Sequence, residues 1–168
     1  MIKHYEIKHL SNKFMQKYPD NIYPEFENKL NRPYVVFIIK IDNHTFALPF
    51  RTNMNHKYGY KFKATGRVTN YSTGLDFTKV VLVDDASLLG DPAIIDNKEY
   101  LELSKKHFFI RKQFIKYFEN YKRYLKNELA SIIGKSEKTV QRCLNSLIEK
   151  KYISRIGTNQ YGYLEVLK

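Results

Sequence analysis

Apolar residues form short continuous runs in the first half of the chain and recur at helical spacing in the second half. The run at 34–41 is almost wholly apolar, which is typical of a strand buried on both faces. Asp42 and Asn43 form a turn signal, and residues 45–50 return as a second strand. Because Pro49 cannot donate a ladder hydrogen bond, we expect this strand to end there or to lie at an edge.

The other segments before residue 97 are less regular. Residues 1–30 are irregular, apart from a short helix that we expect within 10–18, before Pro19. Residues 51–74 form a polar, basic and tyrosine-rich loop, in which 61–63 and 67–69 alternate as short strands do. Loops of this length are uncommon in compact domains and are often functional. The next clear strand is predicted over 75–83.

A long helix is predicted over 97–125. Phe114, Phe118 and Tyr121 recur there at positions i, i+4 and i+7, which is the spacing of one helix face. The lysines and arginines of this segment lie on its other sides. They form either a solvated face or a surface for nucleic acid, and the pattern alone does not separate the two.

The C-terminal segment has the layout of a winged helix. A short helix over 127–133 is followed by Gly134, which supplies the positive φ that ends a helix. Ser136 is expected to cap the N-terminus of a second helix over 137–151. Two strands, at 152–156 and 161–166, complete this layout.

These elements predict an α+β protein. Its first part is a compact, twisted antiparallel β-sheet or barrel with flanking helices, and its second part is the winged-helix-like segment. A chain of 168 residues can hold one domain and a smaller appendage. We therefore place the two domains at 1–125 and 126–168.

The net charge of the chain indicates which class of molecule it binds. Lysine and arginine number 29 against 17 acidic residues, for a formal net charge of +12, which favours a polyanionic partner. The single cysteine permits no disulfide, and the histidines are not at metal-ligand spacing, so we expect neither a metal nor another cofactor. With no long apolar run and no signal-peptide pattern, we expect a cytoplasmic protein that does not enter membranes.

The candidate catalytic residues follow the second strand. Cleavage of RNA by its own 2′-hydroxyl needs a group that takes the proton and cations that stabilise charge on the phosphate. Arg51 offers a planar fork for phosphate oxygens, and Thr52 offers a hydroxyl. His56 offers an imidazole that can exchange a proton, while Lys57 and Arg32 add positive charge.

A series of motifs in order resembles a known family. A Tyr5-Glu6-Ile7 start is followed by N-R-P-Y at 31–34, H-T-F-A-L-P-F-R-T at 44–52, D-F-T-K-V-V-L-V at 76–83 and a long helix. Over roughly residues 1–122 the chain resembles the ToxN/TenpN group of type III toxin–antitoxin endoribonucleases, which is related to the abortive-infection protein AbiQ. The TenpN branch is the most similar, because it favours an L-P-F-R ending and the D-F-T-K strand.

The resemblance implies a fold similar to the Kid/MazF toxins and metal-independent cleavage of RNA such as mRNA, leaving a 2′,3′-cyclic phosphate. It also implies a role in phage defence and a small repeat-encoded RNA antitoxin that blocks the site within a closed protein–RNA oligomer. By position, the family's Thr-Ser pair falls on Arg51 and Thr52, and its upstream basic residue falls on Arg32. Its lysine falls near Met54, which leaves His56 or Lys57 as substitutes. Further RNA-binding residues are expected on charge alone: Lys40, Lys61, Lys63 and Arg67.

A second candidate site lies in the C-terminal segment. The side chains expected on the exposed side of its second helix are of types that pair with base edges: Lys138, Gln141, Arg142 and Asn145. They bind operator DNA, contact RNA, or only decorate a small packed subdomain. The alternative function is therefore a non-enzymatic winged-helix DNA-binding regulator, or a toxin that also represses its own operon.

Overall fold

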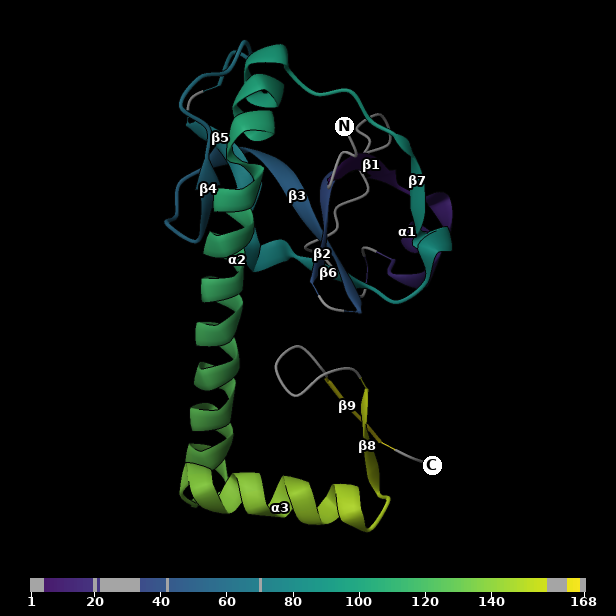
Figure 1. The fold of residues 1–168 in the computed structure, drawn as a ribbon, viewed down its shortest axis with the longest axis vertical. Helices are drawn as coiled ribbons and strands as arrows, with labels where there is room; N and C mark the ends of the chain where they lie inside the picture. Colours follow the sequence, from purple (N-terminus) through teal and green to yellow (C-terminus); the bar gives the residue numbers. More distant parts are fainter. Residues whose placement is uncertain are drawn as a thin grey trace. The chain divides into compact units, whose positions relative to one another are not determined.

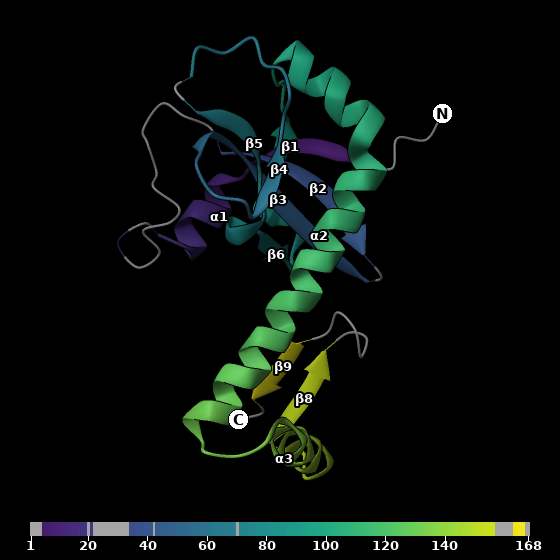
Figure 2. The ribbon, with the colours of Figure 1, turned by 90° about the vertical axis from the view of Figure 1, so that its left-hand side faces the viewer.

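The computed structural model describes residues 5–19, 21, 34–41, 43–69, 71–156 and 163–166 (Figures 1 and 2). The chain divides into two compact units, Met1–Phe114 and Ile115–Lys168. This division falls inside one continuous helix, whereas the sequence suggested a boundary at residue 125. The fold is α+β, as predicted.

The first unit is built on an antiparallel sheet. Its strands are β1 (Glu6–Leu10), β2 (Val35–Ile41), β3 (His44–Met54), β4 (Gly59–Lys61), β5 (Ser72–Asp76), β6 (Val81–Val83) and β7 (Leu89–Pro92). They follow the order β4-β5-β3-β2-β1-β7, and β6 also pairs with β3. In the described part of the chain the sheet does not close, so the barrel alternative is wrong and the open sheet is right.

The predicted hairpin is confirmed by the pairing of β2 with β3, in a register that runs from Ile41 and His44 to Val36 and Pro49. Of the two alternatives expected at Pro49, the end of the strand is wrong, because β3 continues to Met54, and the edge holds on the side away from β2. On the edge of β3 away from β2, β6 pairs with residues 45–47 and β5 pairs from Phe50 onward. Pro49 falls between these two ladders, so its missing N–H interrupts neither.

Two strand predictions are corrected. The single strand over 75–83 is divided into β5 and β6 by a 3-10 turn, η2 (Phe77–Lys79). Asp76 causes the break, since its side chain accepts hydrogen bonds from the backbone N–H and the hydroxyl of Thr78 and so caps η2. The irregular stretch at 1–30 contains β1, an interior strand between β2 and β7.

Each face of the sheet is covered by a helix (Figure 1). One face carries a core in which Phe14, from helix α1 (Asn12–Lys17), packs with Val36, Ile38 and Ala47. The opposite face carries Phe46 and, from helix α2 (Asn97–Ile132), the buried Phe114, whose ring centroid lies 5.3 Å from that of Phe46. The short helix expected within 10–18 is confirmed as α1. His44 is buried and stacks on Phe46.

The second unit contains the C-terminal part of α2, then α3 (Glu137–Glu149) and a hairpin of β8 (Ile153–Ile156) and β9 (Tyr163–Val166). The separate helix predicted over 127–133 is wrong, because α2 runs without a break to Ile132. Gly134 has a φ of 62° and the Ser136 hydroxyl accepts from the Thr139 N–H, so both predicted caps are confirmed. Residues 157–162, between the two strands, lie outside the described residues.

Candidate functional site

Two exposed cations flank a glycine across three neighbouring strands of the first unit. Arg51 of β3 and Lys61 of β4 both register with Gly74 of β5. Directly opposed residues share one face of a sheet, so the two side chains leave the same face. Their Cα atoms lie about 10 Å apart, twice the spacing between strands. We call this set the Arg51–Gly74–Lys61 row.

Close packing holds the row in place. A Cβ atom at Gly74 would meet the Tyr60 carbonyl oxygen and would lie 2.9 Å from Met54 Sδ, so Met54 occupies the space that a side chain there would need. Met54 is itself buried. The register of β3 with β5 shifts between Arg51 and Met54, where Asn53 has a φ of 65°. The bulge thus brings Met54 over the glycine and leaves Arg51 exposed.

A histidine–carboxylate pair lies on the same face. Asp76 is two residues beyond Gly74 on β5, so both residues belong to that face of the pleated strand. His56 Nε2 lies 3.4 Å from Asp76 Oδ2, and Asp76 is buried. The Tyr58 N–H donates to His56 Nδ1 at 3.2 Å, which places the proton of the neutral imidazole on Nε2. Both ring nitrogens of His56 are therefore engaged.

The other three catalytic candidates are placed less favourably. Thr52 follows Arg51 directly in β3, at the start of the bulge, and it is half-buried while Arg51 is exposed. Lys57 is exposed, with Nζ 5.5 Å from the centroid of the Tyr58 ring. Arg32 lies outside the described residues.

The four expected RNA-binding residues do not form one surface. Lys61 belongs to the row. Lys40 is at the far end of the hairpin: its partner Thr45 is six residues from Arg51 along β3, or about 20 Å at the rise of a strand. Arg67 pairs with buried Glu99 at 3.3 Å, and the Lys63 N–H donates to Glu102. The last two contacts attach the loop after β4 to α2.

Three of the four candidate nucleic-acid-binding residues in α3 already make side-chain hydrogen bonds within the second unit. Lys138, Arg142 and Asn145 are exposed, and Gln141 is half-buried. Gln141 accepts from Lys126 at 3.1 Å and donates to Asn145 at 3.0 Å. Arg142 donates to the Thr139 hydroxyl at 3.3 Å. Lys138 is thus the candidate whose side chain is least committed within the described part of the second unit.

Sequence reasoning missed two members of the site. The role of Gly74 depends on strand register, which no local pattern announces. Asp76 had a signal: an aspartate two residues before a threonine is typical of a local turn rather than of a strand interior. With these two included, the site consists of the Arg51–Gly74–Lys61 row and the His56–Asp76 pair on one face of β3, β4 and β5.

The described residues contain neither a helix that could span a membrane nor a cluster of metal ligands. None of their helices is both long and apolar enough to cross a membrane. Within the same ranges, no group of three histidine, cysteine or acidic side chains could hold a metal ion. Comparison of the chain with models of protein families, with curated proteins and with solved structures found no match.

Proposed function

We propose that this protein is a metal-independent endoribonuclease, the toxin of a type III toxin–antitoxin system that is held inactive by a small repeat RNA. The observation that carries the proposal is the Arg51–Gly74–Lys61 row with the His56–Asp76 pair beside it. It combines two exposed cations with a half-buried imidazole on one face of the sheet. The resemblance of the chain to the ToxN/TenpN group supplies the reaction and the antitoxin.

The reaction uses a nucleophile that the substrate carries. The 2′-oxygen attacks the adjacent phosphorus and the bond from phosphorus to the 5′-oxygen breaks, so the products are a 2′,3′-cyclic phosphate and a 5′-hydroxyl. The proton of the 2′-hydroxyl passes to a base, and solvent water supplies the proton that reaches the 5′-oxygen. Arg51 and Lys61, on either side of the phosphate, stabilise the negative charge that develops on its oxygens.

His56 takes the proton of the 2′-hydroxyl in this scheme. Its Nδ1 holds the lone pair, which is shared with the Tyr58 N–H across a long 3.2 Å hydrogen bond. Substrate binding displaces that bond, and the imidazolium that forms is stabilised by the Asp76 carboxylate at Nε2. Thr52, which is half-buried in β3, is not the proton acceptor in this scheme.

The test is cleavage of RNA by purified variants. Arg51→Ala and Lys61→Ala should each lower the single-turnover rate about 100-fold, because each removes a charge that acts on the transition state. Lys105→Ala removes an exposed lysine from α2 and is the matched control, which should cleave at the parental rate. Cleavage in excess EDTA should match cleavage without it.

Expression in bacteria gives a second readout. The parent should arrest growth, and Arg51→Ala and Lys61→Ala should relieve the arrest while far-UV circular dichroism and melting temperature stay parental. Growth arrest by both variants at the parental level would refute the assignment. The antitoxin proposal is tested separately, by extracting and sequencing the small RNA that copurifies with the parent.

The second unit supports an additional candidate function. Its helix, glycine turn, capped helix and hairpin follow the order of a winged helix, and exposed Lys138 and Arg142 lie on α3. We propose DNA binding, as a regulator or as self-repression by the toxin, as the alternative. Arg142→Ala should then weaken binding to duplex DNA from upstream of the gene at least tenfold in gel shifts, and an unchanged affinity would count against it.

A further inference from the structure

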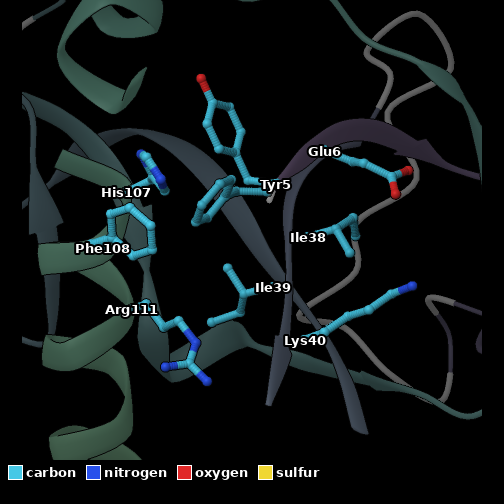
Figure 3. Close-up of a pocket in the computed structure, with 9 residues that line it drawn as sticks. Tyr5, Glu6, Ile38, Ile39, Lys40, His107, Phe108 and Arg111 are labelled. Atoms are coloured by element: carbon cyan, nitrogen blue, oxygen red, sulfur yellow. The ribbon is translucent and has the colours of Figure 1, made fainter. Parts of the chain in front are cut away.

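A pocket of about 410 Å³ opens in the first unit, where the start of β1 and the end of β2 lie beside α2 (Figure 3). Its volume is within the range of about 300–1,000 Å³ that is usual for small-molecule sites. It lies at the end of the hairpin away from the Arg51–Gly74–Lys61 row. The proposed cleavage reaction uses none of its residues.

Aromatic rings line one side of this pocket. Tyr5, His107 and Phe108 are grouped there, with Ile39 facing them (Figure 3). The His107 centroid lies 4.8 Å from that of Tyr5 and 4.1 Å from that of Phe108. Phe108 is 61% exposed, so its ring is accessible to a ligand from solvent. The His107 ring is tilted by 42° from the Tyr5 ring and by 38° from the Phe108 ring, so the group offers separate ring faces at an accessible place.

His107 adds a hydrogen-bond acceptor to this surface. Its Nδ1 lies 2.9 Å from the Ser104 carbonyl oxygen, and because a carbonyl oxygen only accepts, Nδ1 carries the proton. The neutral ring therefore keeps a lone pair on Nε2. Among the residues that the structure describes, Nε2 has no hydrogen-bond partner. It is suited to accept from an amino group of a heterocyclic base.

Positive charge is placed next to the rings. Arg111 follows His107 by one helical turn, is half-buried, and has no ion pair in the described ranges. A half-buried guanidinium that has no carboxylate partner is suited to bind a phosphate. Its planar N–H groups can donate two parallel hydrogen bonds to two phosphate oxygens. Lys40 lines the opposite side of the pocket (Figure 3). Glu6 also lines it, but its carboxylate lies 3.1 Å from Lys8 Nζ and is compensated.

We propose that this pocket binds one nucleotide, with the base against Tyr5, His107 and Phe108 and the phosphate on Arg111. Stacking on aromatic rings suits any base, and a guanidinium beside the rings suits the phosphate that every nucleotide carries. The nucleotide is either free or one residue of a single-stranded RNA. The inference does not depend on cleavage, because the partners of the pocket residues Phe37 and Lys40 in β3 lie three to six residues before Arg51, or about 10–20 Å along the strand.

The test is calorimetric titration of the whole protein with the four nucleoside monophosphates, adenosine, inorganic phosphate and a 2′-O-methyl hexanucleotide. We expect a monophosphate to bind with one-to-one stoichiometry and at least tenfold more tightly than adenosine or phosphate alone. Phe108→Ala and Arg111→Ala should each weaken binding at least tenfold. Arg111→Lys should recover only part of the affinity, since it keeps the charge and loses the fork.

Neighbouring residues on α2 provide matched controls. Phe109→Ala removes an equally exposed phenylalanine, and Lys112→Ala removes an exposed cation; neither residue lines the pocket, so both variants should bind within twofold of the parent. A hexanucleotide that binds more tightly than the monophosphate, and competes with it, identifies the occupant as RNA. The reverse order identifies a free nucleotide. Absence of binding at millimolar concentration, or equal loss in pocket and control variants, overturns the proposal.

Discussion

At the scale of single residues, Asp76 has two tasks in the proposed site. One carboxylate oxygen accepts from the Thr78 backbone N–H at 2.9 Å and ends β5, and the other lies 3.4 Å from His56 Nε2. Asparagine can perform the first task, because its amide oxygen also accepts from a backbone N–H. It cannot perform the second, since it carries no charge to stabilise an imidazolium.

We therefore predict that Asp76→Asn lowers the single-turnover rate of RNA cleavage by about 10- to 100-fold, within the usual contribution of acid–base catalysis. Its melting temperature should stay close to that of the parent. Asp85→Asn is the matched control, because Asp85 caps another 3-10 turn, η3 (Ala86–Leu88), away from His56. A parental rate for Asp76→Asn would show that His56 does not accept the proton.

At the scale of secondary-structure elements, Asp85 links η3 to α1. Its carboxylate accepts from the Ser87 hydroxyl at 2.6 Å and the Ser87 N–H at 2.8 Å, and it lies 3.2 Å from Lys13 Nζ. The Ser87 hydrogen bonds, followed by Lys13, lower the pKa of Asp85 to about 2. A carboxylate whose pKa is lower in the folded state stabilises the fold above its ordinary pKa, and the effect is lost as pH falls towards the folded value.

The melting temperature of the parent should accordingly fall between about pH 4 and pH 2, in part through Asp85. Asp85→Ala should melt lower than the parent at pH 6, and the difference should shrink towards pH 2. Ser87→Ala should act in the same direction, because it removes the largest cause of the lowered pKa. Thermal unfolding followed by circular dichroism from pH 2 to 6 measures both, and parallel curves for parent and variants would contradict the assignment.

The packing of β4 against β5 requires a glycine at position 74, in the middle of the Arg51–Gly74–Lys61 row. A methyl group there would collide with the Tyr60 carbonyl oxygen and with Met54 Sδ, so β4 or β5 would have to shift. We predict that Gly74→Ala destabilises the protein by about 1–3 kcal/mol, the usual cost of overpacking. Gly90→Ala is the matched control in β7, because its nearest contact for a Cβ is an ordinary 3.5 Å. Chemical denaturation of the two variants compares them, and equal stabilities would contradict the prediction.

Local signals explain what could be predicted from the sequence. The hairpin of β2 and β3 follows from apolar runs around a turn, and Gly134 and Ser136 cap helices by the chemistry of their own side chains. Long-range pairing explains the errors. Polar and apolar residues alternate only weakly in β1, and its pairing with β2 and β7 makes it a strand. Arg51 and Lys61 lie close together because both register with Gly74.

At the scale of the whole molecule, positive charge is spread more widely than the proposed site. The chain carries a formal charge of +12, so weak attraction to any nucleic acid is expected and does not identify a binding face. The salt dependence of affinity can identify it. Each phosphate that a cation neutralises contributes about 0.7 to the slope of log affinity against log salt for a single strand.

The last prediction uses a 2′-O-methyl RNA, which lacks the nucleophile and therefore binds without being cleaved. Lys61→Ala should reduce the magnitude of the salt slope by about 0.7, because it loses one phosphate contact, while Lys105→Ala should keep the parental slope. Fluorescence anisotropy at several salt concentrations measures both. If Arg142→Ala reduces the slope and Lys61→Ala does not, RNA binds the second unit. The Arg51–Gly74–Lys61 row would then not bind RNA, and the nuclease proposal would have no substrate-binding surface.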